Sequence, residues 1–406
     1  MRVLIIHMRY LPDLTGTGPL VAELAADLAR LGEQVTVITS MPHYGRLPSG
    51  GRPPRQAVED GVRVIRTPAF PYASGTVAGR ALDYVLCALA SAYDGRRSPK
   101  ADVVLAVAPP LTAGLSAWVA ARGAPLVFNA QDIWPDGLVS MGKLRGALPI
   151  RAAHALERLT YGSAQKVTVL SDGMKNNLVA KGLPPSKVAV IPNWVDLEVV
   201  RPMDKGTALR RELGLEGSFI VLFAGNLGFA AGLETVVTAA ECLRHEPNLA
   251  FLIVGEGSAK AGLMAHAQAL GLSHLRFVTT QPSRRLAEVL ATADISLVPL
   301  RRGMGALSVP SKAMAIMASA RPVLAAVPPD SEVRRVVEEA QAGRCVAPED
   351  PGAMAAEILR MRGEPERLQS FGANGRRYAE EHFGRAAIVA RIHTLLGQVA
   401  VGRAEG

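Results

Sequence analysis

The sequence predicts an α/β protein of two Rossmann-like domains, each a doubly wound sheet of parallel strands covered by helices. Its 406 residues are too many for one ordinary core and suit two domains of roughly 200 residues each. A hydrophobic share of 49% against 20% charged residues is typical of large buried sheets. Short β-branched runs alternate with helical patterns in both halves, as buried parallel strands and crossover helices do. We expect the two domains to face each other across a cleft.

The first half shows this alternation from its first residues. Leu20, Leu24, Leu28 and Leu31 recur at helical spacing and the pattern stops at Gly32, which is typical of a helix and its C-terminal end. Strands are expected on either side of that helix and onward, at Arg2–His7, Gln34–Thr39, Arg63–Thr67, Val103–Ala106, Pro125–Asn129, Lys166–Leu170 and Val188–Ile191. The first half is therefore predicted to be a series of β-α-β units.

The second half restarts the same pattern after Pro192-Asn193-Trp194-Val195-Asp196. Helical stretches at Leu233–Leu243 and Ser283–Thr292 separate strands expected at Phe219–Phe223, Ala250–Val254, Leu275–Val278, Ile295–Pro299, Pro322–Ala326 and Arg344–Val346. The predicted domains are residues 1–192 and 197–382. A last helix, Ala386–Val399, has apolar residues on one face. We expect residues 384–400 to cross back and pack on the first domain.

Bulk properties exclude several classes of protein. Cys87, Cys242 and Cys345 lie far apart without a C-x-x-C pair, so neither a disulfide framework nor a zinc site is predicted, and a reducing cytoplasm is the expected compartment. The short apolar run at the N-terminus favours a buried strand over a secretory signal. The net charge of +9 comes from scattered basic residues with only 5% aromatics, which argues against nucleic acid. This charge suits an anionic membrane surface or a phosphate-bearing substrate better.

The segment from Gly75 to Lys100 has two interpretations. Its apolar run, Ala81–Tyr93, is shorter than the roughly 20 residues that a membrane span needs. The usual behaviour of charge runs favours a core helix with a solvated basic end. The alternative is a helix at the lipid interface, with basic residues near headgroups, and thus a peripheral contact at the inner face of the plasma membrane. Those basic residues are Arg80, Arg96, Arg97 and Lys100.

A candidate anion site lies at the start of a helix in the second domain. Val309-Pro310-Ser311-Lys312 stands at the mouth of that helix, where Ser311 can serve as N-cap. A helix start offers unpaired backbone N–H groups and a partial positive charge, and Lys312 adds a full charge. The ligand we infer is the diphosphate of a nucleotide. An exposed lysine at a surface helix start is the common alternative.

Glycine-containing loops between strands and helices are further candidates. Gly16, Thr17 and Gly18 precede the first helix, and Val21 replaces the third glycine of a dinucleotide fingerprint, so NAD binding is disfavoured. Similar loops in the second domain contain Asn226, Gly228, Gly255 and Glu256. Small residues let a phosphate or sugar come close to the backbone. A plain turn explains the first loop equally well and is the stronger interpretation of the loops in the second domain.

Polar residues follow the second and fifth strands of the first domain. Gln131 and Asp132 come after the strand ending at Asn129, at the sheet edge where parallel sheets bind ligands, and Trp134 follows. Capping of the next turn is the favoured alternative for Asp132. His43 and Tyr44 follow the second strand, although such a histidine more often forms a hydrogen bond within a loop. The sequence has no H-E-x-x-H, D-x-D, G-x-S-x-G or P-loop motif, so no metal is expected.

Taken together, these motifs resemble the retaining GT-B glycosyltransferases of the "glycosyltransferase group 1" type, most closely the branch that builds exopolysaccharide, O-antigen and capsule repeats. The resemblance covers nearly the whole chain. It rests on Gly16-Thr17-Gly18-Pro19, Thr39-Ser40-Met41-Pro42-His43-Tyr44, Ala108-Pro109-Pro110-Leu111-Thr112, Gln131-Asp132-Ile133-Trp134-Pro135-Asp136, Ile191-Pro192-Asn193-Trp194-Val195-Asp196, Gly225-Asn226-Leu227-Gly228, Val254-Gly255-Glu256-Gly257 and Pro310-Ser311-Lys312.

The resemblance implies transfer of a sugar from a nucleotide-diphosphate donor, expected to be a UDP-sugar, to an acceptor hydroxyl with retention and without a metal or other cofactor. It implies donor binding by the second domain and acceptor binding by the first, with cell-surface polysaccharide assembly on a lipid-linked acceptor as the expected role. The implied catalytic residues are Asp132, Lys312 and Gly18. The implied donor-binding residues are Gly16, Thr17, Asn226, Gly228, Gly255, Glu256, Arg301, Ser311, Lys312 and Glu332, and the implied acceptor-binding residues are His43, Tyr44, Gln131 and Trp134.

Two departures from the family pattern keep alternatives open. Asn226 and Ala231 stand where many members carry a basic pair, and the glutamates of the E-x7-E signature are missing before Arg321-Pro322-Val323. Arg301 or Arg302 would then assist as a cation, and Glu332 would hold the ribose. A non-catalytic nucleotide-sugar-binding subunit, a nucleotide-sugar epimerase, or a transferase acting on a soluble secondary metabolite are the alternative functions. The sequence carries no signal for an oligomeric state.

Overall fold

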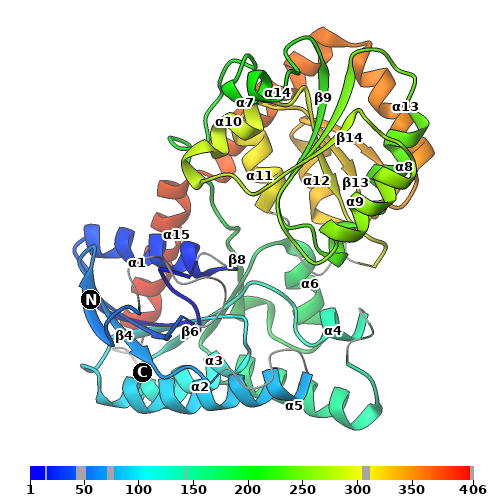
Figure 1. Cartoon of the computed structure of the whole chain (residues 1–406). Coiled ribbons are helices and arrows are strands. Elements are labelled where there is room, and N and C mark those ends of the chain that lie inside the picture. Colours follow the sequence, from blue (N-terminus) through cyan, green and yellow to red (C-terminus); the bar gives the residue numbers. More distant parts are fainter. Residues whose placement is uncertain are drawn as a thin grey trace. The chain divides into compact units, whose positions relative to one another are not determined.

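The computed structural model describes residues 1–13, 16–42, 52–70, 77–140, 142, 144–303 and 311–402. The chain divides into two compact units (Figure 1). Unit 1 comprises Met1–Pro192 and Val389–Gly406, and unit 2 comprises Asn193–Ile388. Each unit has its own sheet of mainly parallel strands with helices on both faces, which confirms the predicted fold class.

The described sheet of unit 1 has the strand order β3-β4-β2-β1-β5-β6-β7-β8. All neighbours pair in parallel except β3, which runs antiparallel to β4 at the edge. The strand order reverses between β1 and β5, which makes the carboxyl ends of these two strands the topological switch point, where open α/β sheets bind ligands. The strands are β1 Arg2–Ile6, β2 Gln34–Ser40, β3 Gln56–Glu59, β4 Val62–Thr67, β5 Val103–Val107, β6 Leu126–Ala130, β7 Lys166–Val169 and β8 Val188–Val190.

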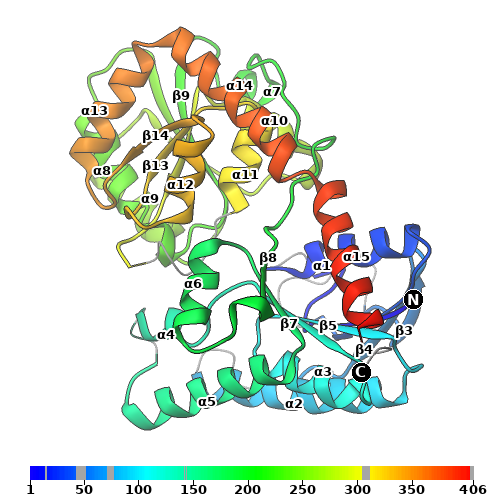
Figure 2. The same cartoon turned by 180° about the vertical axis from the view of Figure 1, so that it is seen from behind.

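Helices α2, α3 and α5 cover one face of this sheet, and α1 lies on the other (Figures 1 and 2). The α15 helix crosses into unit 1 at Val389 and lies on the α1 side, as predicted. There the His393 ring nitrogen Nε2 lies 2.6 Å from a Glu33 carboxylate oxygen, and Arg391 donates to the Val190 carbonyl over 2.8 Å. The helices are α1 Gly18–Arg30, α2 Val77–Arg97, α3 Thr112–Ala121, α4 Asp136–Ser140, α5 Ala147–Ser163, α6 Asp172–Ala180 and α15 Arg385–Val401.

The described sheet of unit 2 is wholly parallel, in the order β11-β10-β9-β12-β13-β14. Its order reverses between β9 and β12, so the carboxyl ends of these strands form the second switch point. Strands β10 and β12 are buried along their whole length, as a sheet covered on both faces requires. The strands are β9 Phe219–Ala224, β10 Leu249–Val254, β11 Leu275–Val278, β12 Ile295–Pro299, β13 Val323–Ala326 and β14 Gly343–Val346.

Three apolar clusters fill the faces of the unit 2 sheet. Val221 and Phe223 of β9 face the core built with α8, α9 and α13, whereas Ile220 and Leu222 face the other side, where α7 and α10 pack. Helices α11 and α12 join a core over β12 and β13. The described helices are α7 Ala208–Glu212, α8 Glu234–Cys242, α9 Lys260–Ala269, α10 Leu286–Ala291, α11 Ser311–Ala318, α12 Glu332–Glu339, α13 Pro351–Arg362 and α14 Pro365–His382.

Local differences from the predicted elements have simple causes. The edge strand β3 was not predicted, because its sequence Gln-Ala-Val-Glu lacks an apolar run and it is only partly buried. The helix expected over Ser283–Thr292 begins as a 3₁₀ turn, Ser283–Arg285, and becomes α10 at Leu286. Among the described helices, none is both long and apolar enough to cross a membrane.

Candidate functional site

In unit 2, the switch point carries Lys312. Lys312 belongs to the first turn of α11, and its ammonium nitrogen lies 4.3 Å from the centre of the Phe223 ring, at the end of β9. Burial lowers the pKa of Lys312 to about 8. No carboxylate of the described residues pairs with it, so the charge is available to an anion. The structure describes α11 from Ser311 onward, and residue 310 lies outside the described residues, so the capping role of Ser311 stays a prediction.

Gly225 makes room for this lysine. Its φ is +144°, and a Cβ built there would lie 2.1 Å from the Lys312 Cε. Any side chain at position 225 would therefore both strain the backbone and push Lys312 out of place. From the sequence, Gly225 is only one residue of a loop motif. The structure shows that its lack of a side chain leaves the space that Lys312 occupies.

The predicted loop residues after β9 and β10 are packed against each other. The Leu227 amide donates to the Glu256 carbonyl over 2.8 Å, and a Cβ on Gly255, whose φ is +149°, would lie 1.9 Å from the Gly225 carbonyl oxygen. Asn226 lies near Gly228, since a Cβ on that glycine would be 2.9 Å from the Asn226 amide nitrogen. The loops after β9 and β10 therefore pack directly against each other beside Lys312.

Glu256, in the loop after β10, forms an ion pair. Its carboxylate lies 2.6 Å from the ammonium of Lys260, four residues along the chain.

Arg301 and Glu332 have partners within unit 2. The Arg301 guanidinium contacts Glu234 at 2.8 Å and Glu349 at 3.4 Å, and its Nε donates to the Phe229 carbonyl over 2.8 Å. Arg302 also contacts Glu349, at 3.4 Å. Glu332 opens α12 and pairs with Arg335 at 2.6 Å. The two arginines are therefore locally neutralised, which leaves Lys312 as the predicted cation without a described carboxylate partner.

The switch point of unit 1 carries a residue that the sequence did not single out, His7. It follows β1 directly and is 1% exposed. Its Nδ1 lies 2.9 Å from the Val107 carbonyl at the end of β5, and its Nε2 lies 2.7 Å from the Thr17 hydroxyl. Since a carbonyl only accepts, Nδ1 carries the proton and Nε2 accepts from Thr17. Burial lowers the pKa of His7 to about 4, so the ring is neutral at pH 7.

This histidine fixes the loop that was predicted to approach the sugar. Thr17 precedes the first residue of α1 without capping it, because its hydroxyl is used by His7. Gly16 has a φ of +60°, and a Cβ on Gly18 would lie 3.1 Å from the Asp13 carbonyl oxygen. The signal that could have revealed His7 was its place as the first polar residue after an apolar strand.

Asp132 lies at the carboxyl edge of the same sheet, after β6. Among the described residues nothing donates a hydrogen bond to its carboxylate, so the predicted capping alternative finds no support. Burial raises its pKa. Beside it, Gln131 donates to Asn129 over 2.6 Å, and Asn129 donates to Thr168 over 2.8 Å. Trp134 is half-buried. A desolvated carboxylate without a partner is typical of a functional group.

The other two predicted acceptor residues, His43 and Tyr44, lie outside the described residues.

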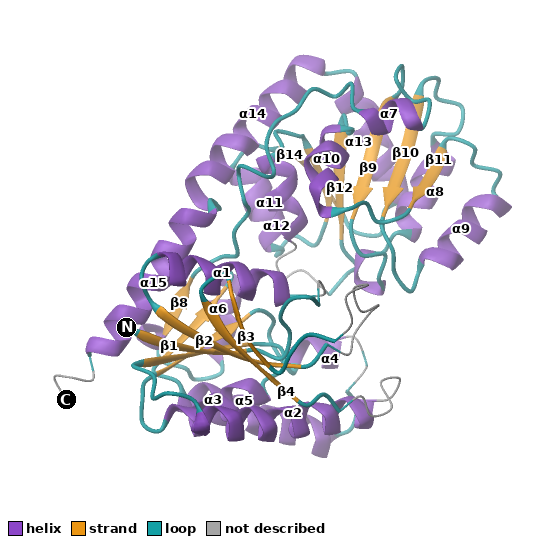
Figure 3. Ribbon diagram, turned by 60° about the vertical axis from the view of Figure 1, so that its left-hand side comes forward, coloured by secondary structure: helices purple, strands orange, loops and turns teal. Residues whose placement is uncertain are grey.

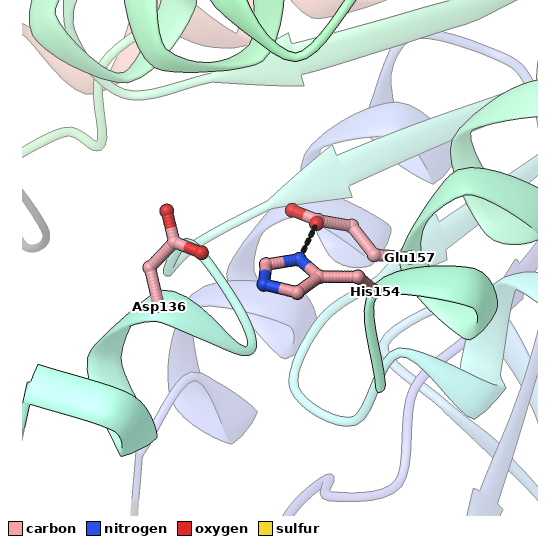
Figure 4. A group of neighbouring side chains, drawn as sticks. All are labelled: Asp136, His154 and Glu157. Atoms are coloured by element: carbon pink, nitrogen blue, oxygen red, sulfur yellow. Dashed lines mark hydrogen bonds and ion pairs between the residues drawn. The ribbon is translucent and has the colours of Figure 1, made fainter. Parts of the chain in front are cut away.

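One group of described side chains has the composition of a metal site (Figure 4). Asp136, His154 and Glu157 place one ligand atom each within 4.8 Å of the others, and the His154 Nδ1 lies 3.0 Å from a Glu157 oxygen. The Lys181 ammonium, however, lies 2.9 Å from Asp136 and 2.7 Å from Glu157. A cation thus already bridges the two carboxylates, and the group is explained as a partly buried ion-pair cluster that joins α4, α5 and the end of α6.

Two family models match the chain, and together they cover most of it. Residues 15–194 match the "Glycosyl transferase 4-like domain" and residues 206–378 match "Glycosyl transferases group 1". WcaI of Escherichia coli (strain K12), a glycosyl transferase named for colanic acid biosynthesis, is 31% identical over 374 residues, which are 88% of this chain and 91% of WcaI. A D-inositol 3-phosphate glycosyltransferase of Thermomonospora curvata is 27% identical, over 90% of this chain and 87% of its own.

Solved structures share the same fold over nearly the whole chain. The sucrose-phosphate synthase of Thermosynechococcus elongatus superposes with a TM-score of 0.79 at 19% identity, covering 99% of both chains. HepE of Anabaena in complex with UDP-glucose gives a TM-score of 0.72 at 17% identity, covering 98% of this chain and 100% of its own. With the two family matches and the WcaI similarity, these folds establish that the chain belongs to the glycosyl transferases group 1 family and is a GT-B glycosyltransferase.

Proposed function

We propose that this protein transfers a sugar from a UDP-sugar to a hydroxyl of a lipid-linked acceptor, with retention at the anomeric carbon, during assembly of a cell-surface polysaccharide. The observation that carries the proposal is Lys312, a partly buried cation without a described carboxylate partner at the switch point of unit 2. The name of WcaI and the UDP-glucose bound to HepE support the polysaccharide and the donor class.

The chemistry requires stabilisation of a departing diphosphate. Charge develops on the leaving group as the bond to the anomeric carbon breaks, and donors aimed at that charge lower the barrier. In this proposal Lys312 contacts the diphosphate, together with the backbone at Ser311 and the backbone of Gly225 to Gly228. The lysine supplies the positive charge, so the proposed reaction needs no metal ion or other cofactor. A donor phosphate oxygen accepts the proton of the acceptor hydroxyl.

Unit 1 supplies the acceptor side in this proposal. The carboxylate of Asp132, which has no described partner, accepts a hydrogen bond from a sugar hydroxyl, and Gln131 and Trp134 line the same sheet edge. His43 and Tyr44 stay proposed acceptor-binding residues on the basis of the sequence alone. Gly18 lets the transferred sugar approach the backbone. His7 is a positioning residue, because it acts through Thr17 and touches no substrate itself. The enzyme works in the cytoplasm, at the inner face of the membrane that holds its acceptor.

The proposal is tested by incubating the enzyme with UDP-, GDP- and dTDP-sugars and a diphosphate-linked lipid acceptor. We expect UDP release only with a UDP-sugar and acceptor together, and NMR of the product is expected to show the donor's anomeric configuration. An inverted product would refute retention. Tight UDP-sugar binding without UDP release for any lipid-linked or soluble acceptor would identify a non-catalytic binding subunit instead, and an isomerised donor would identify an epimerase.

A further inference from the structure

Helix α2 exposes a stripe of large apolar side chains. Leu82, Val85, Leu89 and Tyr93 are 47%, 47%, 63% and 59% exposed. Their spacing of three, four and four residues puts them on one face of the helix. The opposite face holds the buried Asp83 and Cys87, so the helix packs on unit 1 through that side. Single exposed apolar residues are common, but a continuous stripe marks a contact surface.

Neighbouring helices extend this stripe. Trp118 of α3 is 59% exposed, and Leu148 and Leu159 of α5 are 79% and 60% exposed. Helix α3 packs against both α2 and α5, and all three cover the same face of the unit 1 sheet (Figure 3). We call the exposed side of α2, α3 and α5 the docking face.

The charge of the docking face has one sign. The described acidic residues of its helices, Asp83, Asp94 and Glu157, are 3%, 8% and 2% exposed and hence withdrawn from the surface. The exposed charged residues on and directly beside the three helices are all basic: Arg96, Arg97, Lys100, Arg122, Arg145, Arg151 and Arg158. Apolar residues ringed by cations suit an anionic lipid surface, whereas a protein partner's interface is usually poor in such uncompensated charge.

A pocket of about 340 Å³ opens beside the end of this stripe. Its lining includes Tyr93 and three arginines, Arg55, Arg63 and Arg97. The one carboxylate in the lining, Asp94, is engaged with Arg55 at 3.0 Å, while Arg97 donates only to the Tyr93 hydroxyl over 3.1 Å. Three guanidinium groups against one carboxylate leave a net positive pocket with planar donors that match a phosphate.

We propose that the docking face binds the surface of an anionic bilayer, with a lipid headgroup phosphate in the arginine pocket and the α2 stripe in the boundary between headgroups and acyl chains. This departs from the favoured prediction of a core helix with a solvated end, because the exposed side of α2 is apolar from Leu82 to Tyr93. The surface goes beyond the proposed transfer reaction, since it needs neither donor nor acceptor to bind lipid.

The test is co-sedimentation of the full chain with vesicles of phosphatidylcholine, with and without phosphatidylglycerol. We expect binding only to the vesicles that contain phosphatidylglycerol, and loss of binding as salt is raised. Leu82→Glu/Leu89→Glu and Arg63→Ala/Arg97→Ala are each expected to weaken binding at least tenfold. Controls in unit 2, Met264→Glu and Arg276→Ala/Arg377→Ala, change an exposed apolar residue and two exposed arginines and are expected to bind as the wild type does.

Equal binding by wild type and both docking-face variants would overturn the proposal, as would equal binding to neutral vesicles. Circular dichroism and UDP calorimetry on each variant separate a folding defect from a docking defect, since Lys312 lies in the other unit. A variant that binds UDP normally and misses the vesicles supports the docking face. An enzyme that binds vesicles but releases no UDP with any acceptor would refute the proposed transfer and leave the docking face standing.

Discussion

The two units share a fold, but their switch points carry different side chains, a histidine in unit 1 and a lysine in unit 2. In unit 1, His7 stands at the reversal of strand order, fully buried and hydrogen-bonded on both ring nitrogens. In unit 2, Lys312 reaches the corresponding point, over the end of β9, and no described carboxylate neutralises it. Burial lowers both pKa values, to about 4 and about 8. At pH 7 this yields a neutral structural group in one unit and an available cation in the other.

The outer helices of the two units differ in a similar way. Helix α12 of unit 2 pairs its surface charges, with Arg335 contacting both Glu332 and Glu339 and Arg334 contacting Glu338. Helix α2 of unit 1 exposes apolar residues and unpaired cations. Paired charges suit water, whereas unpaired cations beside apolar side chains suit a charged partner surface. The shared architecture therefore does not decide which surface or switch point meets a ligand.

The largest effect is expected from Gly225→Ala, which breaks the unit 2 switch point. Backbone strain at a φ of +144° and overlap with Lys312 should together cost about 4 kcal/mol of stability. Thermal unfolding measures it, and UDP calorimetry at low temperature should show weakened binding. Gly262→Ala is the control, because nothing lies within 4 Å of its Cβ position. Equal unfolding temperatures for the two variants would contradict the steric role of Gly225.

His7 should make unit 1 sensitive to acid. Its ordinary pKa is 6.5 and its folded pKa is about 4, so between these values the unfolded chain binds a proton that the native chain does not. Stability is therefore expected to fall as pH drops from about 6.5 to about 4, by at most about 3 kcal/mol. Urea unfolding followed by tryptophan fluorescence should show this slope. It should flatten in His7→Gln but persist in His266→Gln, an exposed control, and a slope unchanged in His7→Gln would be inconsistent with this role.

Lys312→Met should weaken UDP binding. A charge-assisted contact contributes about 1.5–3 kcal/mol, so the dissociation constant should rise about 10- to 150-fold in calorimetry. Lys260→Met, which removes a cation already paired with Glu256, is the control and should bind UDP nearly normally. The variant should also be more stable than the wild type at neutral pH, because burying the charged lysine opposes folding. Undiminished UDP affinity in Lys312→Met would remove the basis of the proposed donor site.

UDP binding should depend on pH through the protonation of Lys312. Lys312 with a pKa of about 8 is mostly protonated at pH 7 and mostly neutral at pH 9. UDP affinity should therefore fall about tenfold between these values, or about 1.4 kcal/mol. The fall should be absent in Lys312→Met, and an equal fall in both proteins would assign it to another group.

The smallest effect is expected from Glu256→Gln. Its partner Lys260 is the first residue of α9, the Glu256 carboxylate is exposed, and such pairs contribute about 0.2–1 kcal/mol. Unfolding should change by no more than this. A tenfold loss of UDP-sugar affinity would instead show that Glu256 binds the donor directly, as the sequence predicted.

Most elements of the two sheets were predictable from residue type alone. Runs such as Val103–Val107 are buried throughout, and a strand covered on both faces accommodates so many apolar residues in succession. The weakly patterned β3 escaped prediction because an edge strand is held by backbone pairing, which no side-chain pattern records. The site was predicted less completely: Lys312 was identified with its helix, whereas His7 resembled the end of an ordinary strand.

The chain's local pattern of apolar, β-branched and glycine residues was enough to establish two doubly wound domains, the return of the last helix and the family. The pattern of residue types along a short segment does not specify which residues far apart in the sequence come into contact. His7 and Val107 are 100 positions apart in the sequence, and Gly225 and Lys312 are 87 positions apart. Each pair comes together only when the strands align and the sheet order reverses. Packing around those two points also sets the charge of each group, because desolvation depends on the neighbours that the fold assembles.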